Sequence, residues 1–139
     1  MSSTTFYDIQ RALHKHLYDF QSTNIAWENS SRYEPQAGTM YLETHLTHAI
    51  PSQATLGLNG GENLQQGHFQ ITINAPTGKG YNAGKQKASQ IADHFKRGTV
   101  LTYNGVTVRI RKVWPGPPDS EGAWYKIPVM IEYFAFTGN

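Results

Sequence analysis

The pattern that most constrains the fold is the alternation of apolar and polar residues along three segments, residues 40–47, 67–75 and 123–136. Successive side chains of a β-strand point to opposite faces, so this period predicts strands with one apolar and one polar face. Strands of this kind need a sheet whose apolar face is covered by another layer. The middle segment is the clearest, with apolar residues at every second position: Phe69, Ile71, Ile73 and Ala75.

Two other segments have helical spacing. Residues 5–20 and 81–97 each place apolar side chains three or four positions apart, which gathers them on one stripe of a helix. Gly98 follows the second segment and is a plausible end for that helix. The apolar stripes consist of Phe6, Ile9, Leu13, Leu17 and Phe20 in the first helix and of Ala88, Ile91, Ala92 and Phe95 in the second.

The dipeptide Asn104-Gly105 separates two further strand-like segments, residues 100–103 and 106–113. Asn-Gly favours the tight turn of a β-hairpin because both of its residues tolerate positive φ angles. We therefore expect a hairpin close to the second helix.

The remaining segments carry weaker signals. Residues 25–28 predict a short strand, and residues 49–66 and 114–122, which are rich in glycine and proline, predict irregular loops. Pro128 lacks an N–H group, so we expect it to mark a sheet edge or a bulge. The order of elements predicts an α+β fold, a mostly antiparallel β-sheet with two helices packed on one face, in a single domain over residues 1–139.

The composition excludes several classes of protein. The chain has no cysteine, which rules out disulfides, thiolate metal sites and cysteine nucleophiles and suits a reducing compartment. The N-terminus has no apolar core of a signal peptide, and no run approaches the ~18 apolar residues of a membrane helix. We therefore expect a cytosolic product, or one released on lysis, without a membrane partner.

The net charge of +2 is unevenly distributed. Residues 79–112 contain eight Lys and Arg residues and one acid, Asp93, whereas residues 1–78 and 113–139 are both net acidic. Three interpretations compete: a solvated basic face, self-association through complementary faces, and contact with nucleic acid.

The sequence offers little catalytic chemistry. The segment GKGYNAGK (78–85) resembles a phosphate-binding loop, but its glycine spacing is wrong and Gln86 stands where the motif needs Ser or Thr. The six histidines lack metal-ligand spacing, since His14 and His16 point to different faces of a helix. No serine-hydrolase or zinc-protease motif is present. We expect no enzymatic activity, no cofactor and no metal.

Four segments together resemble the tail terminator, or tail-completion, proteins of long-tailed bacteriophages. They are TFYDIQRALHKHL, the stretch IAWEN followed by P..G..YLE, GHFQITINAPTGKG with the following KASQIADHF, and WYKIPVMIEYFA. They span most of the chain in the expected order. The turn at Pro35–Gly38 and the turn at Gly78 and Gly80 are the most specific parts of the resemblance.

The resemblance implies a non-enzymatic virion protein at the head-proximal end of the tail, assembled in the host cytoplasm. It implies a homo-oligomeric ring, a hexamer, that caps the tail tube, ends tube polymerisation and joins the head-completion or connector protein. Genome DNA would pass through the lumen without sequence-specific binding. The alternatives are a neck or head-completion connector protein and a nucleic-acid-binding module.

Candidate residues for self-assembly or partner contact come from the basic segment, the tryptophans beside a proline-rich loop and the apolar residues of the long loop. Arg109 and Arg111 share one strand face, and aromatic residues are favoured interface anchors. The tryptophans could equally close the core. The predicted interface residues are Arg109, Arg111, Lys79, Lys85, Trp114, Trp124, Leu56 and Leu58.

Overall fold

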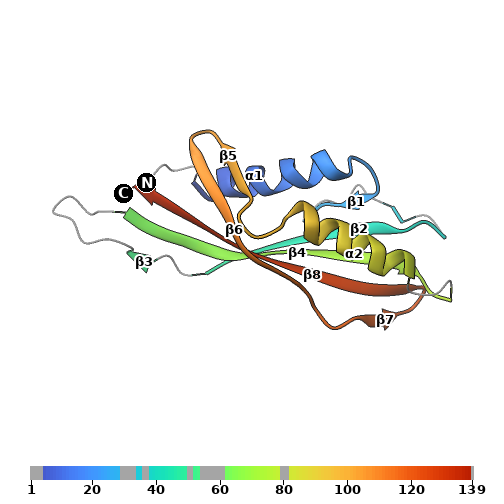
Figure 1. Ribbon diagram of the computed structural model, residues 1–139. Coiled ribbons are helices and arrows are strands. Elements are labelled where there is room, and N and C mark those ends of the chain that lie inside the picture. The colour runs from blue at the N-terminus through green and yellow to red at the C-terminus, as the bar shows by residue number, and fades with distance from the viewer. Residues whose placement is uncertain are drawn as a thin grey trace.

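A computed structural model of the chain describes residues 5–28, 34–35, 38–49, 52–53, 62–78 and 82–138. These residues form the helices and strands labelled in Figure 1. The helices are α1 (Thr5–Phe20) and α2 (Asn82–His94). The strands are β1 (Ile25–Ala26), β2 (Tyr41–His48), β3 (Ser52–Gln53), β4 (Glu62–Pro76), β5 (Val100–Tyr103), β6 (Val106–Pro115), β7 (Asp119–Glu121) and β8 (Trp124–Gly138).

The strands form a twisted sheet in the order β1-β2-β4-β8-β6-β5, with β3 beside β4 and β7 beside β8. Strands β4 and β8 pair along their whole 15-residue lengths and form the spine of the sheet. All pairs are antiparallel except the short parallel pair of β1 with β2. Both helices lie on the same face of the sheet, which confirms the predicted α+β fold (Figure 1).

The core fills the space between the helices and the inner face of the sheet. From α1 it takes Ile9, Leu13 and Leu17, none of which is exposed to solvent. Burying one such side chain contributes roughly 2 kcal/mol. Phe6, which the helical spacing placed on the same stripe, is 42% exposed because it lies at the edge of the core, against the ring of His48. The inner face of the central strands contributes Phe69, Ile71, Ile73, Ile127, Val129, Ile131 and Tyr133.

The two helices are also joined directly by His16 and His94. The rings stack with centroids 3.8 Å apart, and the Nε2 of each ring donates to the other residue's carbonyl oxygen at 2.7 Å. Burial is the main cause of a lowered pKa at His16. The two histidines are 78 residues apart, and no feature of the sequence predicted that they would meet.

Two predicted loops are partly wrong. Within residues 49–66, Ser52–Gln53 form β3 and residues 62–66 begin β4. Within residues 114–122, the first two complete β6 and Asp119–Glu121 form β7. These segments lack apolar alternation because main-chain pairing to β4 or β8, more than apolar burial, holds them in the sheet.

The structure shows what Gly84 and Pro128 pack against. Gly84, part of the phosphate-loop-like segment, lies where α2 approaches β8, and a Cβ there would be 2.8 Å from the Cδ1 of Ile127. Pro128 lies on the central strand β8 and not at the edge of the sheet. It sits where the neighbour of β8 changes from β6 to β7, and its carbonyl oxygen accepts from Gly116 N at 2.8 Å.

The Asn-Gly hairpin prediction is confirmed, with φ of 50° at Asn104 and 83° at Gly105.

Neither α1 nor α2 is long and apolar enough to cross a membrane.

Candidate self-assembly surface

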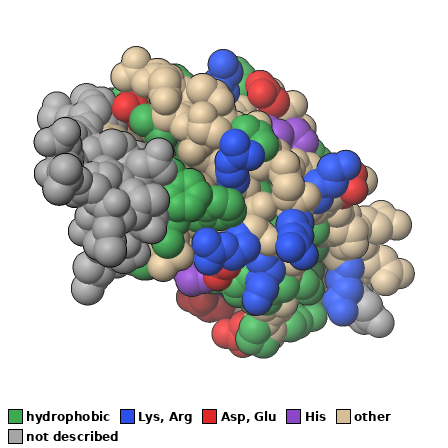
Figure 2. Space-filling view, turned by 60° about the vertical axis from the view of Figure 1, so that its left-hand side comes forward, with side chains coloured by type: hydrophobic (Ala, Val, Ile, Leu, Met, Phe, Trp, Pro, Cys, Tyr) green, Lys and Arg blue, Asp and Glu red, His purple; other side chains and the backbone are tan. Residues whose placement is uncertain are grey.

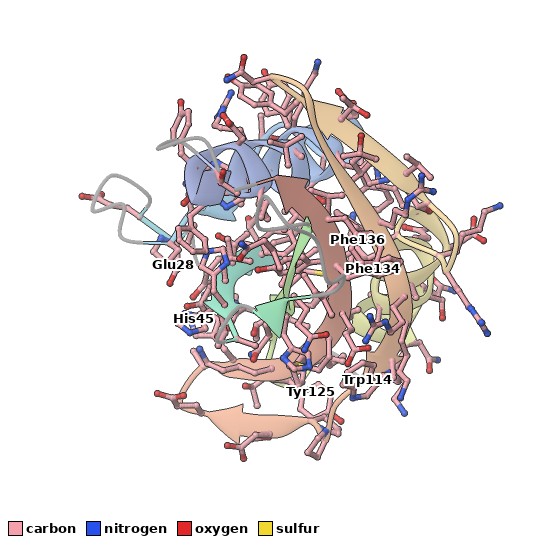
Figure 3. The ribbon with its side chains drawn as sticks, turned by 90° about the vertical axis from the view of Figure 1, so that its left-hand side faces the viewer. Glu28, His45, Trp114, Tyr125, Phe134 and Phe136 are labelled. Carbon is pink, nitrogen blue, oxygen red and sulfur yellow. The ribbon has the colours of Figure 1, made fainter. Side chains whose placement is uncertain are left out.

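The outer face of the sheet, opposite the helices, carries an apolar and basic patch at the end where β8 finishes. Strand register places Val100, Arg109, Phe134 and Gln66 in one row across β5, β6, β8 and β4. Val100 is 50% exposed, and Phe136, two residues along β8 from Phe134, is 49% exposed. The rings of Phe134 and Phe136 meet edge to face with centroids 5.8 Å apart (Figure 3). We call Val100, Arg109, Arg111, Phe134 and Phe136 the aromatic end.

The two arginines of the aromatic end are held differently. The Arg111 guanidinium lies 4.8 Å from the centre of the Phe134 ring, and its Nη1 is 3.6 Å from Glu132 Oε2. It also donates to the Gln66 side-chain oxygen at 3.4 Å. Arg109 is exposed and forms no ion pair with any residue that the structure describes. Arg111 is therefore fixed by its own chain, whereas Arg109 is available to a partner.

A β-bulge brings a third basic residue to this face. The pairing register between β6 and β8 shifts between Ile110 and Lys112, so Lys112 lies opposite Glu132 on the outer face. Plain alternation would have put Lys112 on the core side with Ile110. An extra residue in one strand reverses the alternation beyond it. The sequence signal for this bulge was the adjacent pair of charged residues, Arg111 and Lys112, inside an alternating strand.

Beyond the bulge, Trp114 lies on the outer face with Lys112. The Lys112 Nζ lies 5.4 Å from the centre of the Trp114 ring, and the ring of His68 meets the indole edge to face with centroids 5.9 Å apart. The indole is half-buried. Figure 3 labels Trp114 together with Phe134 and Phe136 of the aromatic end.

The turn after α2 extends the basic surface. Arg97 lines two open hollows, one of about 500 Å³ shared with Arg109, Arg111 and Phe134, and one of about 340 Å³ shared with Lys96 and Lys112. Figure 2 shows Lys and Arg side chains gathered beside a hydrophobic area on one face of the molecule. The patch thus combines exposed apolar area with positive charge, a combination that suits a protein partner or a polyanion.

The other predicted interface residues lie elsewhere. Lys85 is on α2, where it lines a separate hollow with Pro115 and Pro118. Trp124 lies at the opposite end of β8 from Phe136 and packs edge to face on Tyr41, with ring centroids 4.9 Å apart. Lys79, Leu56 and Leu58 fall outside the described residues. Of the predicted set, the structure therefore gathers Arg109, Arg111 and Trp114 on one face and places Lys85 and Trp124 apart from them.

Glu28, two residues after the end of β1, covers the edge of β2. Glu28 Oε1 accepts from Leu46 N at 2.8 Å, and its Oε2 lies 2.9 Å from His45 Nδ1 (Figure 3). The Glu28 main-chain N–H donates to the Thr44 hydroxyl at 2.9 Å. Strand β1 ends at Ala26 and pairs with β2 only at Leu42 and Glu43. Beyond that point the Glu28 carboxylate accepts a hydrogen bond from the exposed edge of β2 in place of a neighbouring strand. Its role is structural.

Titratable groups do not form a recognisable reaction centre in the described part of the chain. No group of three or more His, Asp or Glu side chains there could hold a metal ion. His14 lies between the rings of Trp27 and Phe69, at centroid distances of 4.7 and 5.6 Å, and its Nε2 has no hydrogen-bond partner among the described residues. Burial, and then the charge of Arg11, lower the pKa of His14 to about 4.

This pKa predicts a loss of stability in acid. Because the pKa of His14 falls from 6.5 in the unfolded chain to about 4 in the folded chain, its contribution is complete above pH 6.5 and is lost as the pH falls toward 4. The free energy of unfolding should drop by about 2 kcal/mol between pH 7 and pH 5 from this group. Urea unfolding of wild type and His14→Leu at both pH values tests this. The variant should lose about 2 kcal/mol less than wild type, and equal losses would contradict the assignment.

Comparison with known proteins agrees with the fold described above. One solved structure has a TM-score of 0.74 and 23% sequence identity, with 94% of each chain covered. No curated protein matches the sequence. A family model described as "Phage tail terminator protein" matches residues 8–133, which include most of the four segments that carried the sequence resemblance. The chain belongs to the phage tail terminator protein family.

Proposed function

We propose that the protein caps the tail tube as a closed hexameric ring, ends tube polymerisation and presents the surface to which the head's connector attaches. Family membership makes the chain a structural component of the phage tail and not an enzyme, and capping of the tail tube is the activity that the family implies. The six-fold ring and the joining to the head go beyond the family match and are our inference.

The observation that carries the ring is the aromatic end. A sheet face with Val100 and Phe136 about half exposed, beside an arginine without an ion pair in the described chain, is an unsatisfied surface. Exposed apolar residues rimmed by charge are typical of protein interfaces. When such a surface meets a different surface on the next copy, the repeated contact closes into a ring if the rotation allows it.

The test is the native mass of the purified protein, alone and with polymerising tail-tube subunit, while tube length is measured. We expect a six-fold species, on its own or at tube ends, and tubes that stop growing when it is added. A persistent monomer that leaves tube growth unchanged would contradict capping. In that case binding to purified head connector would favour a head-completion role.

The basic hollows support a weak, sequence-independent contact with DNA passing through the lumen. Lys96 and Arg97, on the turn after α2, can contact phosphates without reading bases. We expect weak binding whose affinity falls steeply with salt and is equal for unrelated sequences, measured by fluorescence anisotropy from 50 to 200 mM salt. Tight binding by the monomer with preference for one sequence would instead favour a nucleic-acid-binding module.

A further inference from the structure

A hollow of about 260 Å³ lies between α2 and the segment that joins β6 to β7. Its walls are mostly apolar and include Ala88, Ala92, Pro115, Pro118, Ile127 and Val129. The outer wall is pinned to β8, because Gly116 N donates to Pro128 O at 2.8 Å and a Cβ on Gly116 would lie 2.9 Å from Pro128 Cγ. This hydrogen bond holds the outer wall of the hollow against β8.

The size of the hollow suits one aromatic side chain. A dry cavity of roughly 150 Å³ accepts a benzene molecule, so about 260 Å³ has room for a phenyl ring entering from outside. The chain presents such a ring at Phe136, which is 49% exposed and is steadied by its edge-to-face contact with Phe134. Aromatic anchors that fill pockets contribute most of the energy in many interfaces.

The charges of the aromatic end and of strand β7, which follows the outer wall of the hollow, are opposite in sign. Phe136 shares the aromatic end with Arg109 and Arg111. The hollow adjoins β7, where Asp119 and Glu121 are exposed, the Glu121 side chain to 75%. Lys85 lines the α2 wall of the hollow, and Glu121 Oε2 lies 3.9 Å from Lys126 Nζ of its own chain, so the attraction is confined to the β7 side. A partner that inserts Phe136 beside β7 would bring arginines to acids, which favours the correct orientation.

The two features lie at opposite ends of one strand. Ile127 and Phe136 are nine residues apart on β8, which corresponds to roughly 30 Å of strand. A chain cannot reach its own hollow across that distance, so the contact joins two copies through different surfaces. Such a head-to-tail contact generates rings or filaments.

We propose that Phe136 of one copy inserts into the hollow between α2 and the β6–β7 segment of the next copy, with Arg109 facing Asp119 and Glu121 of the adjoining β7. This contact rests on the proposed function, since it supplies the repeated interface of the capping ring.

Two variants that each damage one side test the contact. Phe136→Asp removes the inserted ring, and Ser89→Trp fills the hollow from an exposed position on α2. Each variant alone should lose the closed oligomer and fail to stop tail-tube growth. Mixed together, the two variants should form a heterodimer and no larger species. Only one intact contact can form, between Phe136 of the Ser89→Trp chain and the open hollow of the Phe136→Asp chain. Gln90→Trp, an exposed neighbour on α2 that does not line the hollow, should assemble as wild type does.

A charge exchange provides a second measurement. Glu121→Lys should weaken assembly at least tenfold, and combining it with Arg109→Glu in the same chain should restore most of that loss. Urea midpoints equal to wild type would show that all variants fold. Closed oligomers formed by Phe136→Asp, or a mixture that gives no heterodimer, would overturn this contact. Capping by the wild-type protein would not be affected by that result. Wild type that neither assembles nor stops tube growth would overturn the proposed function as well.

Discussion

Replacing Arg109 with glutamate is expected to prevent assembly of the proposed ring while the folded chain stays as stable as wild type. Arg109 is exposed at the centre of the aromatic end and forms no ion pair within the described chain, so folding does not depend on it. Reversing a charge that faces an acidic partner costs at least about 2 kcal/mol per contact, or roughly thirtyfold in its association constant. Because every contact in the ring carries the change, the loss compounds around the ring.

The measurement is native mass and tube length for Arg109→Glu, with urea unfolding as the check on folding. Lys15→Glu is the matched control, because Lys15 is also exposed but lies on α1, opposite the outer face of the sheet. We expect the control to assemble and both variants to unfold within about 0.5 kcal/mol of wild type. Normal rings from Arg109→Glu would remove charge complementarity from the interface, leaving the apolar contact alone.

Gly67→Ala is expected to destabilise the folded chain by about 3 kcal/mol or more. Gly67 lies on β4 between β2 and β8, opposite both His48 and Tyr133. An added Cβ would stand 2.0 Å from the Thr47 carbonyl oxygen and 2.7 Å from the Tyr133 hydroxyl. That hydroxyl is in turn 2.6 Å from His48 Nδ1, so the three central strands would all have to shift.

Urea unfolding measures this effect, which should lower the midpoint by roughly 1.5 M. Gln70→Ala, on the outer face of the same strand, is the matched control and should lose less than about 1 kcal/mol. An unchanged midpoint for Gly67→Ala would mean that the strands are not packed as closely at this point as the structure has them. Burial also raises the pKa of Tyr133, which agrees with a tightly enclosed hydroxyl.

The sequence predicted the elements whose stability comes from apolar burial. α1 was predicted at its observed bounds, and β8 within two residues, because their apolar periods are long and uninterrupted. β3, β7 and the first part of β4 were missed, because polar residues there are held by main-chain pairing to strands distant in sequence. Such pairing leaves no periodic trace in the segment itself.

The candidate surface divides in the same way. The basic segment and the outward direction of Arg109 were readable from composition and alternation. The grouping of Arg109 with Phe134 and Phe136 was not, because it depends on the pairing of β6 with β8. The only sign in the sequence of the bulge that turns Lys112 outward was a charged residue at a position where alternation predicts an apolar one.

The sequence by itself determined the fold class, the two helical stripes, the hairpin turn and the family, since each rests on local spacing of residue types along the chain. Only the tertiary structure decided which face of the sheet stays uncovered and which exposed side chains share it. It also decided that an exposed phenyl ring and an apolar hollow lie at opposite ends of β8. The physical reason is that strand register and layer packing bring together residues with no fixed relation in sequence.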